Sequence, residues 1–102
     1  MKAAIYDKTG GPEVLRYADV PDPACHPRGV VLEVKAISIE GGDVLNRAGG
    51  VMTAQPHIVG YQCAGIVREV GAEVTDLREG QPVVAVMGNG SHAELVGVPA
   101  RA

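Results

Sequence analysis

Two residues that could ligate a metal ion or carry redox chemistry lie six positions apart in the segment Pro-His-Ile-Val-Gly-Tyr-Gln-Cys-Ala-Gly, residues 56–65. The imidazole of His57 is a common metal ligand, and the thiolate of Cys63 could serve as a ligand or as a redox group. Between them, Tyr61 and Gln62 can both donate hydrogen bonds toward a carbonyl oxygen. The segment therefore raises three alternatives: a metal site, a thiol redox site, or neither.

The cysteine count argues against redox chemistry. Cys25 and Cys63 are the two cysteines of the chain, and neither belongs to a Cys-x-x-Cys pair. A free cysteine without a neighbouring thiol is most often a small buried residue, so we expect reduced thiols and a buried Cys63. His57 follows Gln55 and Pro56 in a polar segment, which predicts a surface loop. We expect His26 and His92 to be surface residues as well.

A second group of candidate residues lies in Glu-Gly-Gly-Asp-Val-Leu-Asn-Arg, residues 40–47. Asp43 could cap a helix of about two turns within residues 41–50, which Gly49 and Gly50 could end. It could equally have a role in a site. Arg47 comes one turn after Asp43, where it could pair with that carboxylate or face a cleft instead.

The elements that must position these residues are mostly strands. Patterns of apolar residues bounded by Gly and Pro predict strands over residues 2–7, 13–20, 29–38, 66–71, 83–87 and 93–98. The clearest is 29–38, in which Val30, Leu32, Val34 and Ala36 share one face. Many short strands and one short helix predict a mainly β fold, a small barrel or rolled sheet.

The segment from Gly88 to Ala93 matches the glycine pattern of a dinucleotide-binding turn, G-x-G-x-x-A, after an apolar run. That motif requires a helix directly afterwards and an acidic residue about 20 positions later. Residues 93–98 instead have the pattern of a strand. We therefore predict a hairpin turn at residues 88–90 that joins the last two strands.

Composition limits the class of function. The chain has 102 residues with 46% hydrophobic and 21% charged residues, which is typical of a single globular domain. A formal net charge of −3 and the absence of a Lys/Arg run exclude a basic nucleic-acid footprint. No apolar run approaches the roughly 18 residues of a membrane span, and the start lacks the pattern of a signal peptide. We expect no membrane association and a cytoplasmic protein.

Four motifs in order resemble the medium-chain dehydrogenase/reductase superfamily. They are Gly10-Gly11-Pro12-Glu13-Val14-Leu15, Val34-Lys35-Ala36, Gly60-x-x-x-Ala64-Gly65-x-Val67, and Val70-Gly71 followed by Val74. The resemblance runs over nearly the whole chain and is closest to the quinone oxidoreductase branch. It implies that residues 1–102 form the start of a GroES-like catalytic domain, a rolled β-barrel with one short helix.

The resemblance also implies that the chain is a fragment. Relatives continue into a Rossmann domain that holds the nicotinamide cofactor, so only one wall of the cleft would be present here. The implied parent is an enzyme that uses NADPH, by family habit, to reduce a small-molecule quinone or enone. The isolated chain would be inactive, and the parent would be a homodimer assembled through the other domain.

Zinc-dependent relatives hold their metal with a Cys after the Val-Lys-Ala strand and with a Gly-His-Glu motif. Glu40, Tyr61 and Gln62 occupy those positions here. A phenol and an amide are poor zinc ligands, so the resemblance implies a zinc-independent enzyme with no metal site.

The same resemblance implies roles for five residues. Tyr61 and Gln62 would act as catalytic groups toward a quinone or enone oxygen, whereas Glu40, Asp43 and Arg47 would lie on the cofactor side. Glu40 departs from the branch, which commonly has an Asn there. The alternative is a GroES-like binding or co-chaperonin-type module without enzymatic activity, since residues 48–52 resemble a mobile co-chaperonin loop.

Overall fold

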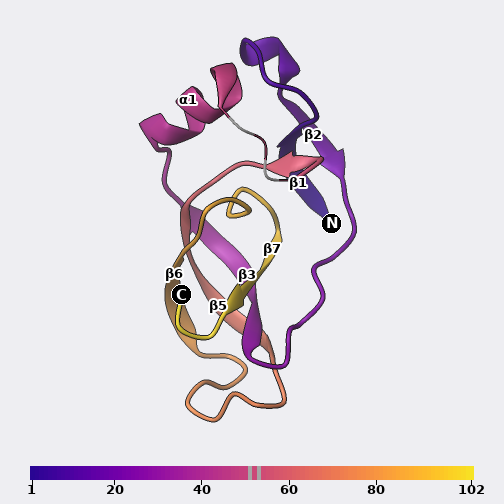
Figure 1. Ribbon diagram of the computed structural model, residues 1–102. Helices are drawn as coiled ribbons and strands as arrows, with labels where there is room; N and C mark the ends of the chain where they lie inside the picture. The colour runs from indigo at the N-terminus through magenta and orange to yellow at the C-terminus, as the bar shows by residue number, and fades with distance from the viewer. Residues whose placement is uncertain (51, 53) are drawn as a thin grey trace.

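The structure is a computed structural model that describes residues 1–50, 52 and 54–102 (Figure 1). In these residues the chain forms seven strands, one 3-10 turn and one α-helix. The mainly β class with one short helix is therefore confirmed. The elements are β1 (Lys2–Tyr6), the 3-10 turn Pro12–Val14, β2 (Arg16–Asp19), β3 (Gly29–Ile37), α1 (Gly41–Gly49), β4 (His57–Ile58), β5 (Gln62–Val70), β6 (Pro82–Val86) and β7 (Leu95–Pro99).

The strands build two antiparallel sheets, one of three strands in the order β2-β1-β4 and one of four in the order β6-β5-β3-β7. The smaller sheet lies with α1 at one end of an elongated molecule of 42 × 24 × 21 Å (Figure 1). A bridge between Ala3 and Ala93 joins the two sheets. Within the described residues no further pairing closes them into a barrel.

The core is made of aliphatic residues from the larger sheet. Strand β3 lies between β5 and β7, and its first four residues are buried in succession. Both faces of β3 are therefore covered at this end, and the Pro-rich segment before β3 lies close to the neighbouring β7: a Cβ on Gly97 would stand 3.4 Å from Ala24 O. The buried cluster consists of Val30, Leu32, Cys63, Val67, Ala85, Val96 and Val98.

Two predicted strands begin elsewhere. The strand predicted over residues 13–20 starts only at Arg16, because Pro12 opens a 3-10 turn in which Leu15 N–H donates to Pro12 O at 3.1 Å. Strand β5 starts at Gln62, four residues before the predicted boundary of 66. Its early part is stabilised by pairing with β6, a contact that local pattern does not reveal.

The predicted hairpin at residues 88–90 is wrong. Strands β6 and β7 lie at opposite edges of the larger sheet. After Gly90, which has the expected positive φ of 112°, the chain crosses to the smaller sheet, where His92 N–H donates to Val59 O at 2.8 Å. A strand, β7, rather than a helix follows this turn, so the dinucleotide-binding pattern lacks its helix.

Two further predictions concern the segment at residues 48–52 and a membrane span. Ala48 and Gly49 of the loop that resembles a co-chaperonin loop form the last turn of α1, and Val51 lies outside the described residues. Within the described part of the chain, no helix is both long enough and apolar enough to cross a bilayer.

Candidate functional site

Helix α1 and the turn before β5 are held together by side chains of the helix. Asp43 Oδ1 accepts a hydrogen bond of 3.1 Å from the backbone N–H of Gly60, and Asn46 Nδ2 donates to the hydroxyl of Tyr61. The ring of Tyr61 also lies against Gly42: a Cβ there would stand only 2.8 Å from Tyr61 Cε2. The two halves of the sequence that carry candidate residues therefore meet at this contact.

Asp43 is not the N-cap that the sequence offered as one alternative. The N-cap of α1 is Glu40, without a side-chain capping hydrogen bond. Asp43 is instead the third helical residue, and its carboxylate points at the Gly60 turn, where its second oxygen is buried and has no hydrogen-bond partner among the described residues. Arg47 does not pair with Asp43 but donates its Nε–H to Gly10 O at 3.3 Å.

Glu40 and Gln62 belong to one closed network with Ser38. Gln62 Nε2 donates to Ser38 Oγ and to Glu40 Oε1, both at 2.6 Å, and Ser38 Oγ donates to Glu40 Oε1 at 3.2 Å. His92 Nε2 lies 3.2 Å from Ser38 O and ties the same segment to the chain before β7. The network forms because Ile37 at the end of β3 pairs with Cys63 near the start of β5.

The structure corrects the placement of two histidines. His57 is not a surface residue: it is 5% exposed, because β4 pairs it with Tyr6 and the two rings stack with centroids 4.7 Å apart. Burial lowers the pKa of His57, and the nearby charge of Asp43 opposes that shift in part. His92 is half-buried, whereas His26 is exposed as predicted.

Cys63 is 5% exposed, as predicted, and burial raises the pKa of its thiol. Burial likewise raises the pKa of Cys25, which is half-buried. A raised pKa leaves less thiolate at neutral pH, so neither residue has the environment of a reactive cysteine.

The residues at the zinc positions of the resembling family do not fit a zinc ion. Glu40 and Gln62 are hydrogen-bonded to each other, and the Tyr61 hydroxyl accepts a hydrogen bond from Asn46. Zinc sites are usually built from Cys, His and carboxylate ligands. In the described residues no group of three His, Cys, Asp or Glu side chains could hold a metal ion.

Two hollows adjoin these residues. A groove of about 390 Å³ has Ser38 and Gln62 as its polar residues, and its other walls are apolar. A smaller hollow of about 220 Å³ lies between α1 and the smaller sheet and is lined in part by Asp43, Arg47 and His92. The residues that complete the groove are Ala36, Ile37, Cys63, Ala64, Val84, Ala85 and Val86.

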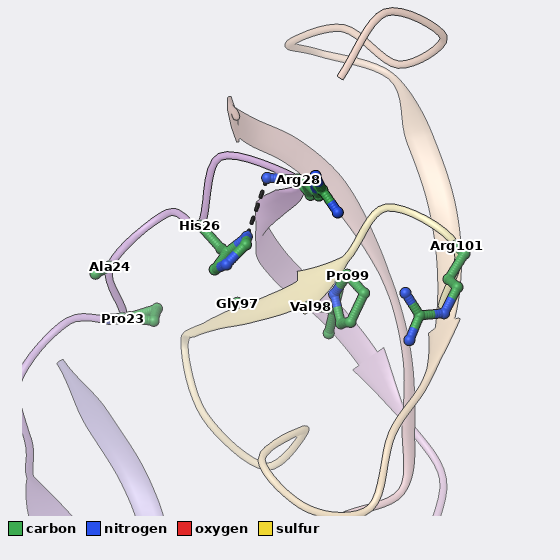
Figure 2. Close-up of a pocket in the computed structure, with 8 residues that line it drawn as sticks. All are labelled: Pro23, Ala24, His26, Arg28, Gly97, Val98, Pro99 and Arg101. Atoms are coloured by element: carbon green, nitrogen blue, oxygen red, sulfur yellow. Dashed lines mark hydrogen bonds between the residues drawn. The ribbon is translucent and has the colours of Figure 1, made fainter. Parts of the chain in front are cut away.

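A larger hollow of about 500 Å³ lies elsewhere and contains none of the five predicted site residues. Figure 2 shows that its lining comes from the segment before β3 and from the end of β7. That is the opposite end of β3 from Ser38, about 26 Å away at 3.3 Å per residue. The lining residues are Pro23, Ala24, His26, Arg28, Gly97, Val98, Pro99 and Arg101.

Residues 26–102 match the family model of the alcohol dehydrogenase GroES-like domain. The chain belongs to that family. It is thereby a GroES-like N-terminal domain of the medium-chain dehydrogenase/reductase superfamily, as the four motifs implied.

Relatives of this GroES-like domain include quinone oxidoreductases and an alkenal/one oxidoreductase. Quinone oxidoreductase from Pseudomonas syringae superposes with a TM-score of 0.90 at 35% identity, over 96% of this chain and 31% of that chain. The Escherichia coli quinone oxidoreductase complexed with NADPH gives 0.91 at 28% identity, over 97% and 31%. The chloroplastic NADPH-dependent alkenal/one oxidoreductase of Arabidopsis thaliana is 34% identical over 89 residues, 83% of this chain and 23% of the relative. The chain thus spans less than a third of the length of these relatives.

The structure brings the two candidate segments into contact, but the sequence analysis missed several residues that join them. Nothing in the sequence marked Ser38 and Gly42 as site residues, because a hydroxyl and a glycine are common in any loop. The position of Asn46 did give an indication: it lies three positions after Asp43, hence on the same side of the helix.

Proposed function

We propose that this chain forms the substrate-side wall of the cleft in an NAD(P)H-dependent oxidoreductase that reduces quinones or conjugated carbonyls without zinc. The observation that carries the proposal is the contact of α1 with the Gly60–Gln62 turn. At that contact a phenol and an amide stand where metal-dependent relatives would need ligands. The similarity to quinone oxidoreductases and to an alkenal/one oxidoreductase supports the substrate class.

When bound, a reduced nicotinamide would supply a hydride with its electron pair to the substrate. The residues of this chain would bind and orient the two reactants. Tyr61 and Gln62 would face the substrate oxygen, where charge develops during reduction. Glu40, Asp43 and Arg47 would face the cofactor, and an anionic Glu40 would favour the cationic, oxidised nicotinamide.

Most of the cofactor contacts would come from a further domain, and assembly into a homodimer would use that domain too. The preference for NADPH over NADH belongs to the same proposal. In this arrangement the 102-residue chain alone would be inactive, because hydride transfer requires cofactor and substrate to be held rigidly together.

The test uses the full gene product. Consumption of NADPH is followed by nicotinamide absorbance with a small quinone and with a conjugated ketone, before and after treatment with a zinc chelator. We expect turnover that the chelator leaves unchanged. Absence of turnover with every quinone and enone would refute the substrate class, and chelator-sensitive turnover would refute zinc independence.

A binding or co-chaperonin-type module without activity is the other candidate, and the molecular mass in solution separates the two. A sevenfold ring would contradict the reductase, whereas a dimer agrees with it.

A further inference from the structure

The donor groups of Gln62 are already used inside the protein. A carboxamide has two N–H groups, and Gln62 directs its nitrogen at Ser38 Oγ and at Glu40 Oε1, both at 2.6 Å. With both hydrogens engaged, Gln62 can offer a substrate only its carbonyl oxygen, which is an acceptor. A carbonyl oxygen of a quinone or enone is an acceptor too, so the two groups have no hydrogen bond to form.

Tyr61 is in the opposite situation. Its oxygen accepts a hydrogen bond from Asn46 Nδ2, and no hydrogen bond among the described residues uses the hydroxyl hydrogen. Tyr61 is half-buried, and its ring lies against Gly42 of α1. Asn46 therefore determines the direction of the free hydrogen, because the phenol oxygen receives the amide on one side and must donate elsewhere.

We propose that Tyr61 alone donates the hydrogen bond to the substrate's carbonyl oxygen, and that Asn46 is the residue that positions it. This inference rests on the proposed function and narrows it. Gln62 then has a structural role: its hydrogen bonds hold Glu40 and Ser38 in place just before α1.

A bound reduced nicotinamide would supply a hydride with its electron pair and would itself become oxidised, and the hydride would form a C–H bond at the β-carbon of the conjugated carbonyl. The π electrons shift to the oxygen, which becomes an enolate oxygen hydrogen-bonded by Tyr61 O–H. A proton from water then completes the reduction at the α-carbon, and Tyr61 keeps its own proton.

The amide of Asn46 strengthens the donation. A hydroxyl that accepts a hydrogen bond becomes a better donor, because successive hydrogen bonds polarise one another. The ring packs closely against the helix, since Tyr61 Cε2 and Oη lie 2.8 and 2.9 Å from where a Gly42 Cβ would stand. Preorganised donors of this kind are typically worth about 10²–10³-fold in kcat.

The direct test measures the stretching frequency of the substrate's carbonyl bond in a complex that does not turn over. The full gene product is bound to oxidised cofactor and a conjugated ketone, and difference infrared spectroscopy records the carbonyl stretch, which moves to lower frequency when the oxygen accepts a hydrogen bond. We expect the downshift to be lost in Tyr61→Phe, with kcat reduced about 10²-fold. Gln62→Met should keep the downshift whatever its effect on turnover.

Two substitutions at Asn46 provide the matched control. Asn46→Asp places an acceptor where the amide donated, so the phenol hydrogen turns to the carboxylate and the downshift is lost. Asn46→Leu removes the partner but leaves the hydrogen free, so the downshift is reduced and not abolished. A merely structural role would give both variants the same spectrum, and thermal unfolding of each variant checks that it folds.

The outcomes separate this inference from the proposed function. If Gln62→Met loses the downshift while Tyr61→Phe keeps it, or if Asn46→Asp behaves as wild type, the assignment of the donor is wrong and the reductase remains. If the wild-type protein neither binds nor reduces any conjugated carbonyl or quinone, the proposed function and the assignment of the donor are both wrong.

Discussion

Replacement of Gly42 by Ala should reduce activity without a matching loss of stability. The added Cβ would stand 2.8 Å from Tyr61 Cε2, whereas ordinary contact begins at 3.4 Å, so the ring must retreat by at least about 0.6 Å. A displacement of about 1 Å at a catalytic group can cost about 10²-fold in rate, so we expect kcat to fall about tenfold. The helix gains up to about 1 kcal/mol from Ala over Gly, which offsets about 1 kcal/mol from a weakened hydrogen bond between Asn46 and Tyr61.

The neighbouring glycine supplies the control. A Cβ at Gly41 meets nothing within 4 Å, so Gly41→Ala gains helix propensity and leaves Tyr61 in place. Both variants of the full gene product are compared by kcat with a quinone substrate and by urea unfolding. If Gly42→Ala and Gly41→Ala have equal kcat, the ring of Tyr61 has no role in catalysis and the reasoning is refuted.

Three further predictions concern stability. Because burial depresses the pKa of His57 below 6.5, the free energy of unfolding should be highest above pH 6.5 and should fall as the pH drops through that value toward the folded-state pKa. The variant His57→Phe keeps a ring against Tyr6 and should reduce this pH dependence in urea titrations. An unchanged pH dependence would contradict the role given to His57. Gly60→Ala should destabilise by about 2–4 kcal/mol, because φ is +117° and the new Cβ would clash with Ser91 Oγ; a thermal shift below 1 °C would argue against this geometry. Cys63 should react with a thiol reagent only as fast as the protein unfolds, and labelling at an exposed-thiol rate would contradict its burial.

Local pattern predicted the parts of the fold that local interactions determine. The alternation in residues 29–38 identified β3, and the change of period after Glu40 identified α1. It failed where distant segments stabilise one another. Strand β4 has two residues and exists because Ile58 and His57 pair with β1. The hairpin prediction failed for the same reason, since the chain after Gly90 bonds to the smaller sheet rather than to β6.

The candidate site also depends on contacts between distant residues that local pattern does not predict. The family resemblance made Glu40 and Gln62 candidates, but 22 positions separate them, and nothing in their spacing indicates a contact. The register of β3 against β5 does: Ile37 opposite Cys63 puts the residues that follow β3 beside those that begin β5. Because side chains alternate between faces, a slip of one residue would turn Gln62 away from Ser38. The predicted start of β5 at residue 66 omitted this pairing. The Gln62–Glu40 contact therefore depends on a long-range register that no local pattern of residues specifies.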